Sequence, residues 1–507
     1  MVRCSSCIAL ALALGQSLYA QWQVVSTDHL PSVAYDGVAQ ADGSLRAIVN
    51  GFDSLDRIDE ADLLTIDIEG TPSDTVELLW DGARVMGTRL YARPDTGTFF
   101  ATGLRVHEFP SGAQLQGFVA EVAPQAVTMT PYGPIEHSTM DGQGFVDSDG
   151  SLVFSHYDFA DFWFGEFAYW ITRFCPGAGV CDSTLIMELV GGWRMHCVAR
   201  LDPMQITGIM DALEEECEPY ANNRHGVVQF SSDLEVEDCL PLDTLGVGAF
   251  GEPTGFYDHI SMISIPGGGF VLSGLAKEHI PGDVTYPAGL QYARPGEPAI
   301  AKRLFREAPE EVEATWPGTM RGLSPFNGST FAFAYTEKAY SPSPWPTVSE
   351  VSNVHVLRLD TSLNILGEFV FNGEAMDRYH CLNSVVAAPD GAVYIMGSVY
   401  DYGDATPRPK AWVARVAPEQ FVSVPEIKHA GLSIAPNPGS DGFMLHTQNA
   451  LPGAQIAIYD LHGRLQHTEI VTGPAHWTHV PALAGGIYVV RVTARDGSQW
   501  ATRWVKQ

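Results

Sequence analysis

The sequence is poor in positive charge and lacks the motifs of several enzyme classes. Lysine and arginine together number 29 against 60 aspartates and glutamates, which gives a formal net charge of −31 at neutral pH. Such a surface repels phosphate backbones, so the composition argues against nucleic acid as a partner. The chain contains no Gly-x-Ser-x-Gly elbow, no His-Glu-x-x-His pair and no lysine directly after a glycine. These absences exclude the usual serine-hydrolase, zinc-peptidase and P-loop patterns.

Long hydrophobic runs are missing as well. No stretch reaches the ~18 apolar residues that indicate a membrane-spanning helix. The first twenty residues instead place Arg3 before a short apolar run, residues 8–14, and end on the small residue Ala20. That order is typical of a secretory signal peptide, so we expect export, cleavage before Gln21 and a mature chain without a transmembrane segment.

Cysteines are few, and beyond the signal segment no Cys-x-x-Cys pair indicates a zinc site. Six cysteines remain in the mature chain, and disulfides persist in exported proteins. Six cysteines allow 15 pairings. We expect one disulfide between Cys175 and Cys181, which enclose a flexible Pro-Gly-Ala-Gly-Val loop. A second is expected between Cys217 and Cys239, which bracket an acidic segment.

Glycine, in contrast, is abundant, and many of the 50 glycines stand in a turn before β-branched and aromatic residues. Asp-Gly and Asn-Gly turns are strong hairpin signals. The recurring turn glycines are Gly43, Gly97, Gly150, Gly268, Gly328 and Gly391. The one double interval, after Gly150, suggests a degenerate copy around Gly191–Gly192. Seven units of several strands each predict an all-β fold, an irregular β-propeller of about seven blades, with tandem β-sandwiches as the alternative.

One segment has helical spacing. Residues 203–220 place Ile206, Ile209, Met210 and Leu213 at intervals of three and four. This spacing predicts an amphipathic helix, which we interpret as an insertion in the irregular fourth blade.

Carboxylates are the main candidates for chemistry in the body of the chain. Asp147 and Asp149 stand two apart before the turn at Gly150, an arrangement that can give oxygen ligands to calcium. The stretch lacks the further acidic ligands of an EF-hand loop, and Asp401 with Asp404 is a weaker version of it. Calcium is the one cofactor that the sequence suggests.

Residues 156–170, HYDFADFWFGEFAYW, interleave Asp158, Asp161 and Glu166 with eight aromatic side chains. A glycosidase needs two carboxyl groups beside a sugar that stacks on aromatic rings. The alternative, which we favour, is an aromatic strand pair that packs one blade on the next. The adjacent pairs His196–Cys197 and His380–Cys381 are assigned to packing or disulfides, because neighbours on a strand point to opposite faces.

The last 76 residues differ from the body in composition and pattern. From Leu432 onward the net charge is +1, whereas the remainder of the chain carries −32. Apolar residues alternate at period two between glycine turns, which predicts a small antiparallel β-sandwich. The motif residues of this tail are Pro436, Asn437, Pro438, Tyr459, Asp460, Gly463, Arg464, Gly486, Ile487, Tyr488 and Lys506.

In this order and spacing, at the end of a chain with a signal-like N-terminus, these residues resemble the type A C-terminal sorting domain of proteins exported by the type IX secretion system. The resemblance implies recognition by the outer-membrane translocon and removal by a sorting peptidase, followed by release or anchoring at the cell surface. The expected organisation is a signal peptide (1–20), a cargo domain (21–424), a linker (425–431) and the sorting domain (432–507).

The sequence leaves the cargo's ligand open. We expect a non-catalytic binding or adhesion module for a protein or a glycan. The alternative is an extracellular propeller hydrolase that acts on polysaccharide, which only the acidic and aromatic content supports.

Overall fold

The structure is a computed structural model, and nearly all of its described residues lie in β-strands or the turns between them. It describes residues 22–25, 31–53, 58–81, 85–94, 97–109, 112–124, 126–133, 138–161, 166–190, 195–202, 205–211, 225–241, 246–247, 253–254, 256–265, 269–276, 278–280, 283–285, 287–294, 300–304, 315–327, 329–337, 352–373, 378–401, 408–421, 432–435, 439–447, 453–460, 465–471, 473, 475–493 and 499–506. The chain divides into two compact units, residues 1–423 and 424–507.

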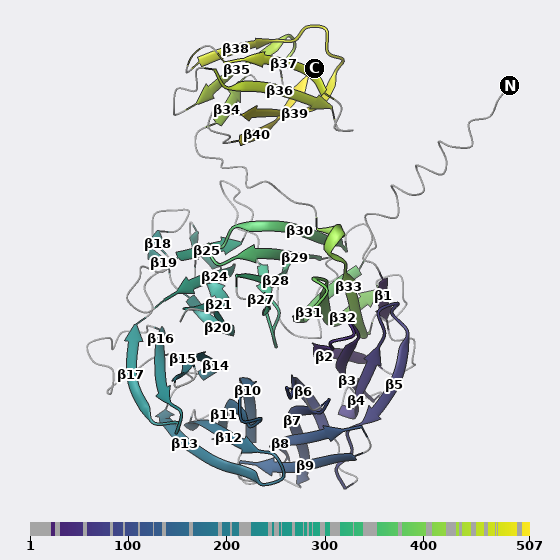
Figure 1. The fold of residues 1–507 in the computed structure, drawn as a ribbon, viewed down its shortest axis with the longest axis vertical. Coiled ribbons are helices and arrows are strands. Elements are labelled where there is room, and N and C mark those ends of the chain that lie inside the picture. Colours follow the sequence, from purple (N-terminus) through teal and green to yellow (C-terminus); the bar gives the residue numbers. More distant parts are fainter. Residues whose placement is uncertain are drawn as a thin grey trace, which may run out of the picture. The chain divides into compact units, whose positions relative to one another are not determined.

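The first unit is a ring of antiparallel sheets, each of which we call a blade (Figure 1). Blade 1 consists of β2 (Ser32–Ala39), β3 (Leu45–Phe52), β4 (Ile58–Ile66) and β5 (Pro72–Glu77). Blade 2 consists of β6 (Val85–Ala92), β7 (Phe99–Phe109), β8 (Gly112–Ala123) and β9 (Ala126–Tyr132). Blade 3 consists of β10 (Ser138–Val146), β11 (Leu152–Asp161), β12 (Glu166–Cys175) and β13 (Gly179–Val190).

The middle of the ring is less regular. Blade 4 consists of β14 (Met195–Asp202), β15 (Gln205–Asp211), β16 (His225–Ser231) and β17 (Val236–Pro241). A single parallel pair, Gln143 with Cys197, joins it to blade 3. Blade 5 consists of β20 (Phe256–Ile265), β21 (Gly269–Ala276), β24 (Ala288–Ala293) and β25 (Ile300–Leu304). Two short hairpins flank it, namely β18 (Gly246–Val247) with β19 (Pro253–Thr254) and β22 (Glu278–Ile280) with β23 (Asp283–Thr285).

The last two blades complete a seven-bladed propeller. Blade 6 consists of β26 (Thr315–Pro317), β27 (Leu323–Asn327), β28 (Thr330–Glu337), β29 (Asn353–Asp360) and β30 (Ile365–Asn372). Blade 7 consists of β31 (Arg378–Ala387), β32 (Val393–Asp401), β33 (Lys410–Val416) and the N-terminal strand β1 (Trp22–Val25). Because β1 pairs with β33, from Trp22 with Arg415 to Val25 with Trp412, the two ends of the ring meet in one sheet. The predicted fold class is confirmed, and the sheets of the described residues agree with the expectation of about seven blades.

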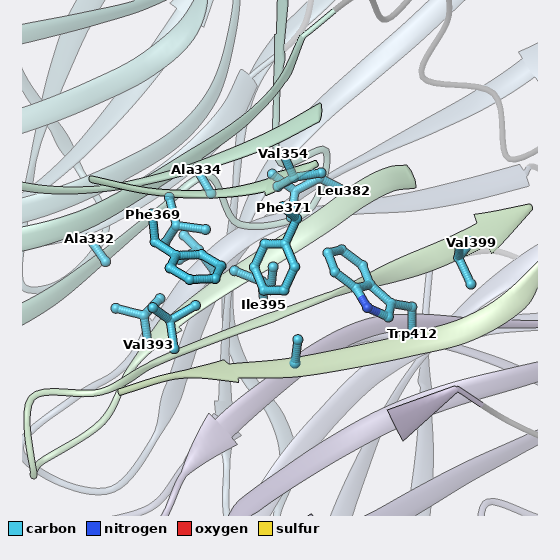
Figure 2. Close-up of a cluster of buried hydrophobic side chains, with 14 residues drawn as sticks. Ala332, Ala334, Val354, Phe369, Phe371, Leu382, Val393, Ile395, Val399 and Trp412 are labelled. Carbon is cyan, nitrogen blue, oxygen red and sulfur yellow. The ribbon is translucent and has the colours of Figure 1, made fainter. Parts of the chain in front are cut away.

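Hydrophobic side chains between facing blades hold the ring together, because each sheet buries an apolar face against its neighbour. Figure 2 shows the cluster between blades 6 and 7, where Phe369 and Phe371 lie against β32 and β33. The ring of Phe371 meets that of Trp412 edge to face, with centroids 5.1 Å apart. Edge-to-face aromatic pairs add to the stabilisation that burial gives, so this contact fixes how the two blades pack.

Six hairpins in the described part of the propeller share one turn geometry. In each, the amide of the first residue donates to the carbonyl of the fifth, and the amide of the fourth donates to the carbonyl of the first. The fourth residue has positive φ, the region that glycine enters at least cost. These fourth residues are Gly43, Gly70, Gly150, Leu234, Leu363 and Gly391. Three of them are turn glycines that the sequence predicts, whereas the predicted turns at Gly268 and Gly328 lie outside the described residues.

One prediction for blade 4 is wrong. Residues 205–211 form strand β15, not a helix, because residues 205–210 pair with β14 on one side and residues 205–211 pair with β16 on the other. Pairing on both sides satisfies its backbone, and this tertiary context overrides the helical spacing. The first described hairpin of blade 4 pairs Asp202 with Gln205. Gly191–Gly192, around which the sequence suggests a degenerate copy, lies outside the described residues. Residues 212–220 of the predicted helix lie outside the described part.

The second unit is a β-sandwich, as predicted. One sheet holds β34 (Leu432–Ala435), β35 (Gly442–Thr447) and β38 (Ala475–His479). The other holds, in spatial order, β37 (Leu465–Ile470), β36 (Gln455–Asp460), β39 (Gly486–Thr493) and β40 (Gln499–Lys506). Alternate residues of the strands fill the space between the sheets, among them the fully buried Phe443 and Trp504. This alternation is the period-two pattern of the sequence.

Candidate functional site

The proposed calcium residues lie in the first turn of blade 3 against two arginines. The carboxylate of Asp147 is buried and receives a hydrogen bond from Arg200 of blade 4. Arg173 lies between the two acids, with Nη1 3.6 Å from Oδ2 of Asp147 and 3.5 Å from Oδ2 of Asp149. Partial burial raises the pKa of Asp149, but hydrogen bonds from Ser151 and the charge of Arg173 outweigh it and hold the pKa below its usual range.

This arrangement ties blades 3 and 4 together, since Arg173 also donates to the Ser232 carbonyl. Among the residues that the structure describes, no three His, Cys, Asp or Glu side chains are grouped to hold a metal ion. The calcium site at Asp147 and Asp149 stays a prediction, and the two guanidinium groups count against it. The weaker candidate Asp401 pairs with Arg378 at 3.3 Å, and Asp404 lies outside the described residues.

The aromatic stretch of residues 156–170 forms the strand pair β11 and β12. His156 is buried, with its ring centroid 4.9 Å from that of Tyr132 in blade 2 and 6.4 Å from that of Trp170. Its Nε2 lies 2.9 Å from the Thr172 hydroxyl. His156 therefore packs between blades 2 and 3, as the interpretation that we favour expects. The side chains of residues 159–167 lie outside the described part.

The structure confirms one of the two predicted disulfides and does not describe the other. Cys175 and Cys181 form the predicted disulfide at the β12–β13 turn. The amide of Gly177 in this loop donates to Glu121 Oε1 of blade 2 at 2.9 Å, so the closed loop contacts the next blade. Cys217 and the side chain of Cys239 lie outside the described residues, and their disulfide stays a prediction. Cys381 carries a buried thiol whose pKa is raised to about 12 by burial.

His380 is buried between blades 6 and 7, where its imidazole packs against other side chains. Its ring centroid lies 4.6 Å from that of Trp412. Burial lowers the pKa of His380 to about 4, because the surroundings disfavour the imidazolium. This histidine is thus neutral at physiological pH.

Sequence reasoning missed an array of titratable groups on blade 6, which we call the histidine array. His355 of β29 lies between two carboxylates, with Nδ1 2.7 Å from Glu368 Oε1 and Nε2 3.3 Å from Glu337 Oε2. The ring of Tyr335 stacks on the imidazole at 4.7 Å. Asn353 donates to Glu337 at 2.9 Å and fixes the carboxylate further.

The electrostatics of the histidine array favour an imidazolium. Burial lowers the pKa of His355, but the hydrogen bonds and charges of Glu368 and Glu337 outweigh this and raise it above its usual value. The two carboxylates keep 17% and 29% of their side-chain surface exposed, for Glu337 and Glu368 respectively. The three residues come from three different strands, β28, β29 and β30. The sequence could predict their proximity only if the pairing register of these strands were known.

The centre of the ring contains polar contacts between blades far apart in the chain. Arg321, between β26 and β27, donates to the carboxylate of Asp36 on β2 at 2.7 Å and to the Leu90 carbonyl of β6 at 2.9 Å. Arg89 donates in return to the Met320 carbonyl. Asp36 is fully buried, so this ion pair lies inside the molecule.

In the sandwich, the structure describes part of the predicted motif. The guanidinium of Arg491 lies over the Tyr459 ring, 4.9 Å from its centroid, and donates to its hydroxyl. Lys506 is buried, and its Nζ donates to the carbonyls of Val480 and Pro481 at 2.7 and 2.8 Å. The hydroxyl of Tyr488 donates to the Ala484 carbonyl at 2.7 Å. The two contacts of Lys506 connect the edge strand β40 to the loop before β39.

The other motif residues are described less fully. Gly486 begins β39 and Asp460 ends β36, while the side chains of Asp460 and Ile487 are not described. Residues outside the described part are Pro436, Asn437, Pro438, Gly463 and Arg464. The roles of all these motif residues in sorting stay predictions.

Comparison with known proteins supports the assignment of the tail. Residues 433–507 match the family described as the secretion system C-terminal sorting domain. No relative among curated proteins matches the sequence.

Three solved structures illustrate the weak likeness of the whole chain to known folds. Prolyl oligopeptidase B from Galerina marginata is 11% identical over 74% of this chain and 47% of its own, with a TM-score of 0.37. The chain thus spans about half the length of that enzyme. The β-propeller domain of the Trilobed protease from Pyrococcus furiosus is 10% identical over 73% of this chain and 90% of its own, with a TM-score of 0.34. Polysaccharide lyase Uly1 is 9% identical over 79% of this chain and 99% of its own, with a TM-score of 0.44.

The fold and the tail together define a class of protein, a secreted β-propeller with a C-terminal sorting domain. The sorting domain marks the chain as one exported by the type IX secretion system to the cell surface or the extracellular space. Among the described residues, no helix is long and apolar enough to cross a membrane. The predicted export by the type IX system and the predicted localisation are confirmed.

Proposed function

We propose that residues 21–424 are a non-catalytic binding or adhesion module that the type IX system delivers to the outside of the cell. The precursor begins with a signal peptide, residues 1–20, and a linker at 425–431 precedes the sorting domain. The ligand is a protein or a glycan, recognised on a face of the propeller.

The observation that carries this proposal is a set of polar contacts that joins the inner strands of several blades. Arg321 and Asp36 form an ion pair, and backbone groups of blades 2 and 7 complete the contacts. The carboxylates that sequence reasoning selected, Asp147 and Asp149, are engaged by Arg173 and Arg200. Carboxylates that are already paired with arginines are poor candidates for acid or base catalysis, which supports recognition on a face of the propeller over chemistry at these residues.

The test uses the secreted protein on a glycan array and in a release assay with complex polysaccharides. We expect saturable binding without turnover. Release of any product by the purified protein would contradict the binding-only function.

The histidine array favours a second candidate, a polysaccharide-active hydrolase. Its two carboxylates are part-exposed and joined through an imidazole that can carry a proton, which are the elements of general acid and base catalysis. In this case Glu337→Gln and Glu368→Gln each abolish product release, whereas Asp401→Asn, in the surface pair with Arg378, leaves it unchanged. Equal activity of the three variants would remove the array as the site.

The export route has its own test. Residues 425–507 fused behind a periplasmic reporter direct the reporter to the surface or the medium in a strain with the type IX system, and leave it in the periplasm in a strain without it. Retention in both strains would contradict the proposed boundaries of the sorting unit.

A further inference from the structure

The segment Gly318–Gly322, which we call the plug, leaves the hairpin ladder of blade 6 and pairs with blade 7. The amides of Met320 and Arg321 donate to the Asn383 carbonyl at 2.8 and 3.1 Å, and the Val385 amide donates to the Arg321 carbonyl at 2.8 Å. These backbone bonds hold the plug beside β31, the innermost strand of blade 7 (Figure 1). They also fix the direction in which the Arg321 side chain leaves the backbone.

From this position, the Arg321 side chain reaches two further blades. One terminal nitrogen, Nη2, contacts Asp36 Oδ2 of blade 1 and the Leu90 carbonyl of blade 2. The other, Nη1, lies 3.5 Å from the Gly37 carbonyl, and the guanidinium carbon lies 5.9 Å from the Tyr91 ring centroid. A single side chain of blade 6 thus connects blades 1 and 2, while its own backbone connects blade 7.

The partners around Arg321 form a receptor for a guanidinium ion. They are all hydrogen-bond acceptors, namely a carboxylate and two main-chain carbonyls, with the face of an aromatic ring nearby. Guanidinium groups match such sets because they carry several donors in one plane and interact well with aromatic faces. The Leu90 amide donates to Asp36 Oδ2 at 3.0 Å and orients the carboxylate toward the guanidinium.

The carboxylate of Asp36 could accept a further hydrogen bond. Oδ1 of Asp36 is buried and accepts no hydrogen bond from the described residues. In this geometry Arg321 uses only one oxygen of the carboxylate, whereas a guanidinium ion without a tether can approach both oxygens.

We propose that the centre of the propeller is a guanidinium-binding site which the chain fills with its own Arg321, and that this contact is the latch that holds blades 1, 2, 6 and 7 in a closed ring. The site goes beyond the proposed function, because it assigns the centre to the chain itself and leaves external ligands to the faces. A buried charge that loses its only ionic partner is strongly destabilising.

The test starts from Arg321→Ala in the otherwise unchanged protein. We expect the unfolding equilibrium, measured with urea, to shift toward the unfolded state by roughly a hundredfold or more, the effect of breaking a buried ion pair. Guanidinium chloride below about 0.1 M, where its denaturing effect is small, should restore stability along a saturating curve. Sodium chloride at equal ionic strength should not restore it.

Two matched variants separate site occupancy from a general salt effect. Asp36→Asn in the Arg321→Ala background removes the carboxylate and should abolish the rescue by guanidinium. Arg378→Ala removes an arginine from the partly exposed pair with Asp401 and should show a small loss without rescue. Rescue that persists without Asp36, or that equals the rescue of the Arg378 variant, would overturn the proposal.

If Arg321→Ala does not fold, refolding yield replaces stability as the readout. The yield should then rise with guanidinium, and Asp36→Asn should fold with Arg321→Met because neither charge remains. Arg321→Lys, which keeps the charge but not the planar fork, should lie between the natural protein and the alanine variant. An Arg321→Ala variant as stable as the natural protein would contradict the proposal that Arg321 holds the ring closed.

Discussion

At the scale of single residues, two histidines of the propeller respond to pH in opposite directions. His380 is neutral and buried beside Trp412, whereas His355 lies between two carboxylates. Burial lowers the pKa of His380, whereas the neighbouring carboxylates raise that of His355. Because each pKa differs between the folded and the unfolded state, each makes the stability of the protein depend on pH.

For His380, stability is present above pH 6.5 and is lost as the pH falls toward 4. In that range the unfolded chain binds a proton with a pKa near 6.5, whereas the folded chain does not until its lowered pKa of about 4. The linkage amounts to about 2 kcal/mol between pH 7 and pH 5. We expect His380→Phe to remove this part of the acid sensitivity, measured as urea midpoints at both pH values. The same loss of stability on acidification in both proteins would contradict the assignment.

For His355 the sign is reversed, because its pKa is raised in the folded state. Its stabilisation is fully present below the unfolded pKa of about 6.5 and disappears as the pH rises through the folded value. We expect His355→Gln to be less stable than the natural protein at pH 6 by about 1 kcal/mol, reduced because the groups are part-exposed, and the difference to shrink on going to alkaline pH. Thermal unfolding across pH 6 to 10 measures it, and a difference between the two proteins that does not change with pH would contradict the assignment.

At the scale of elements, the disulfide closes a short loop at the outer hairpin of blade 3. We expect Cys175→Ser with Cys181→Ser to cost about 2 kcal/mol or less, since a loop this small restricts the unfolded chain only modestly. Part of this loss of stability should come from the hydrogen bond between the Gly177 amide and Glu121, which we expect to weaken when the loop is no longer closed. Urea unfolding with and without reductant is the measurement, and reductant should shift the natural protein to the stability of the double variant. A shift of the double variant itself by reductant would point to another disulfide.

The last strand of the sandwich depends on a buried amine. Lys506 donates to the carbonyls of Val480 and Pro481, so Lys506→Met leaves two acceptors without their donor. We expect a loss of about 1–3 kcal/mol for the sandwich and faster proteolysis of the tail. Arg491→Met is the matched control, because its guanidinium is exposed over Tyr459 and should contribute about 0.5–1 kcal/mol. Equal proteolysis rates for the two variants would contradict a structural role of Lys506.

The hairpins show how far local sequence predicts this fold. Gly43, Gly150 and Gly391 reveal their turns because glycine fits positive φ, and the strands after them follow. The turns at Leu234 and Leu363 have the same geometry but not the residue that signals it, and both side chains are buried. Burial of a leucine compensates there for an unfavourable backbone conformation, which a local pattern cannot express.

At the scale of the whole molecule, contacts between residues far apart in the chain are the part of the structure that the sequence does not predict. The period of about 60 residues predicts the number of blades, but Asp36 and Arg321 stand 285 residues apart and their contact has no local signal. The same holds for the histidine array, whose members need the register of β28, β29 and β30. Conversely, the tail is predicted well because its motif is compact and its alternation is regular.

The closure of the ring is the feature that involves the whole chain, and it depends on a strand of four residues. β1 lies at the edge of blade 7, so only alternate amides of β1 face β33, while the others point away from the sheet. Proline removes the amide hydrogen and is tolerated in an edge strand only where that amide points outward. Gln23→Pro and Val24→Pro are therefore a matched pair at adjacent positions of the same strand.

We expect one of these two variants to be about 1–3 kcal/mol less stable, as the loss of a ladder hydrogen bond with an acceptor left unpaired requires, and the other to remain close to the natural protein. Deletion of residues 22–25 should have a larger effect, because it exposes the whole edge of β33 and invites pairing between molecules. Urea unfolding measures the first effect, and light scattering over a range of protein concentrations measures the second. Two proline variants of equal stability, together with a deletion that remains monomeric, would show that the ring closes without β1.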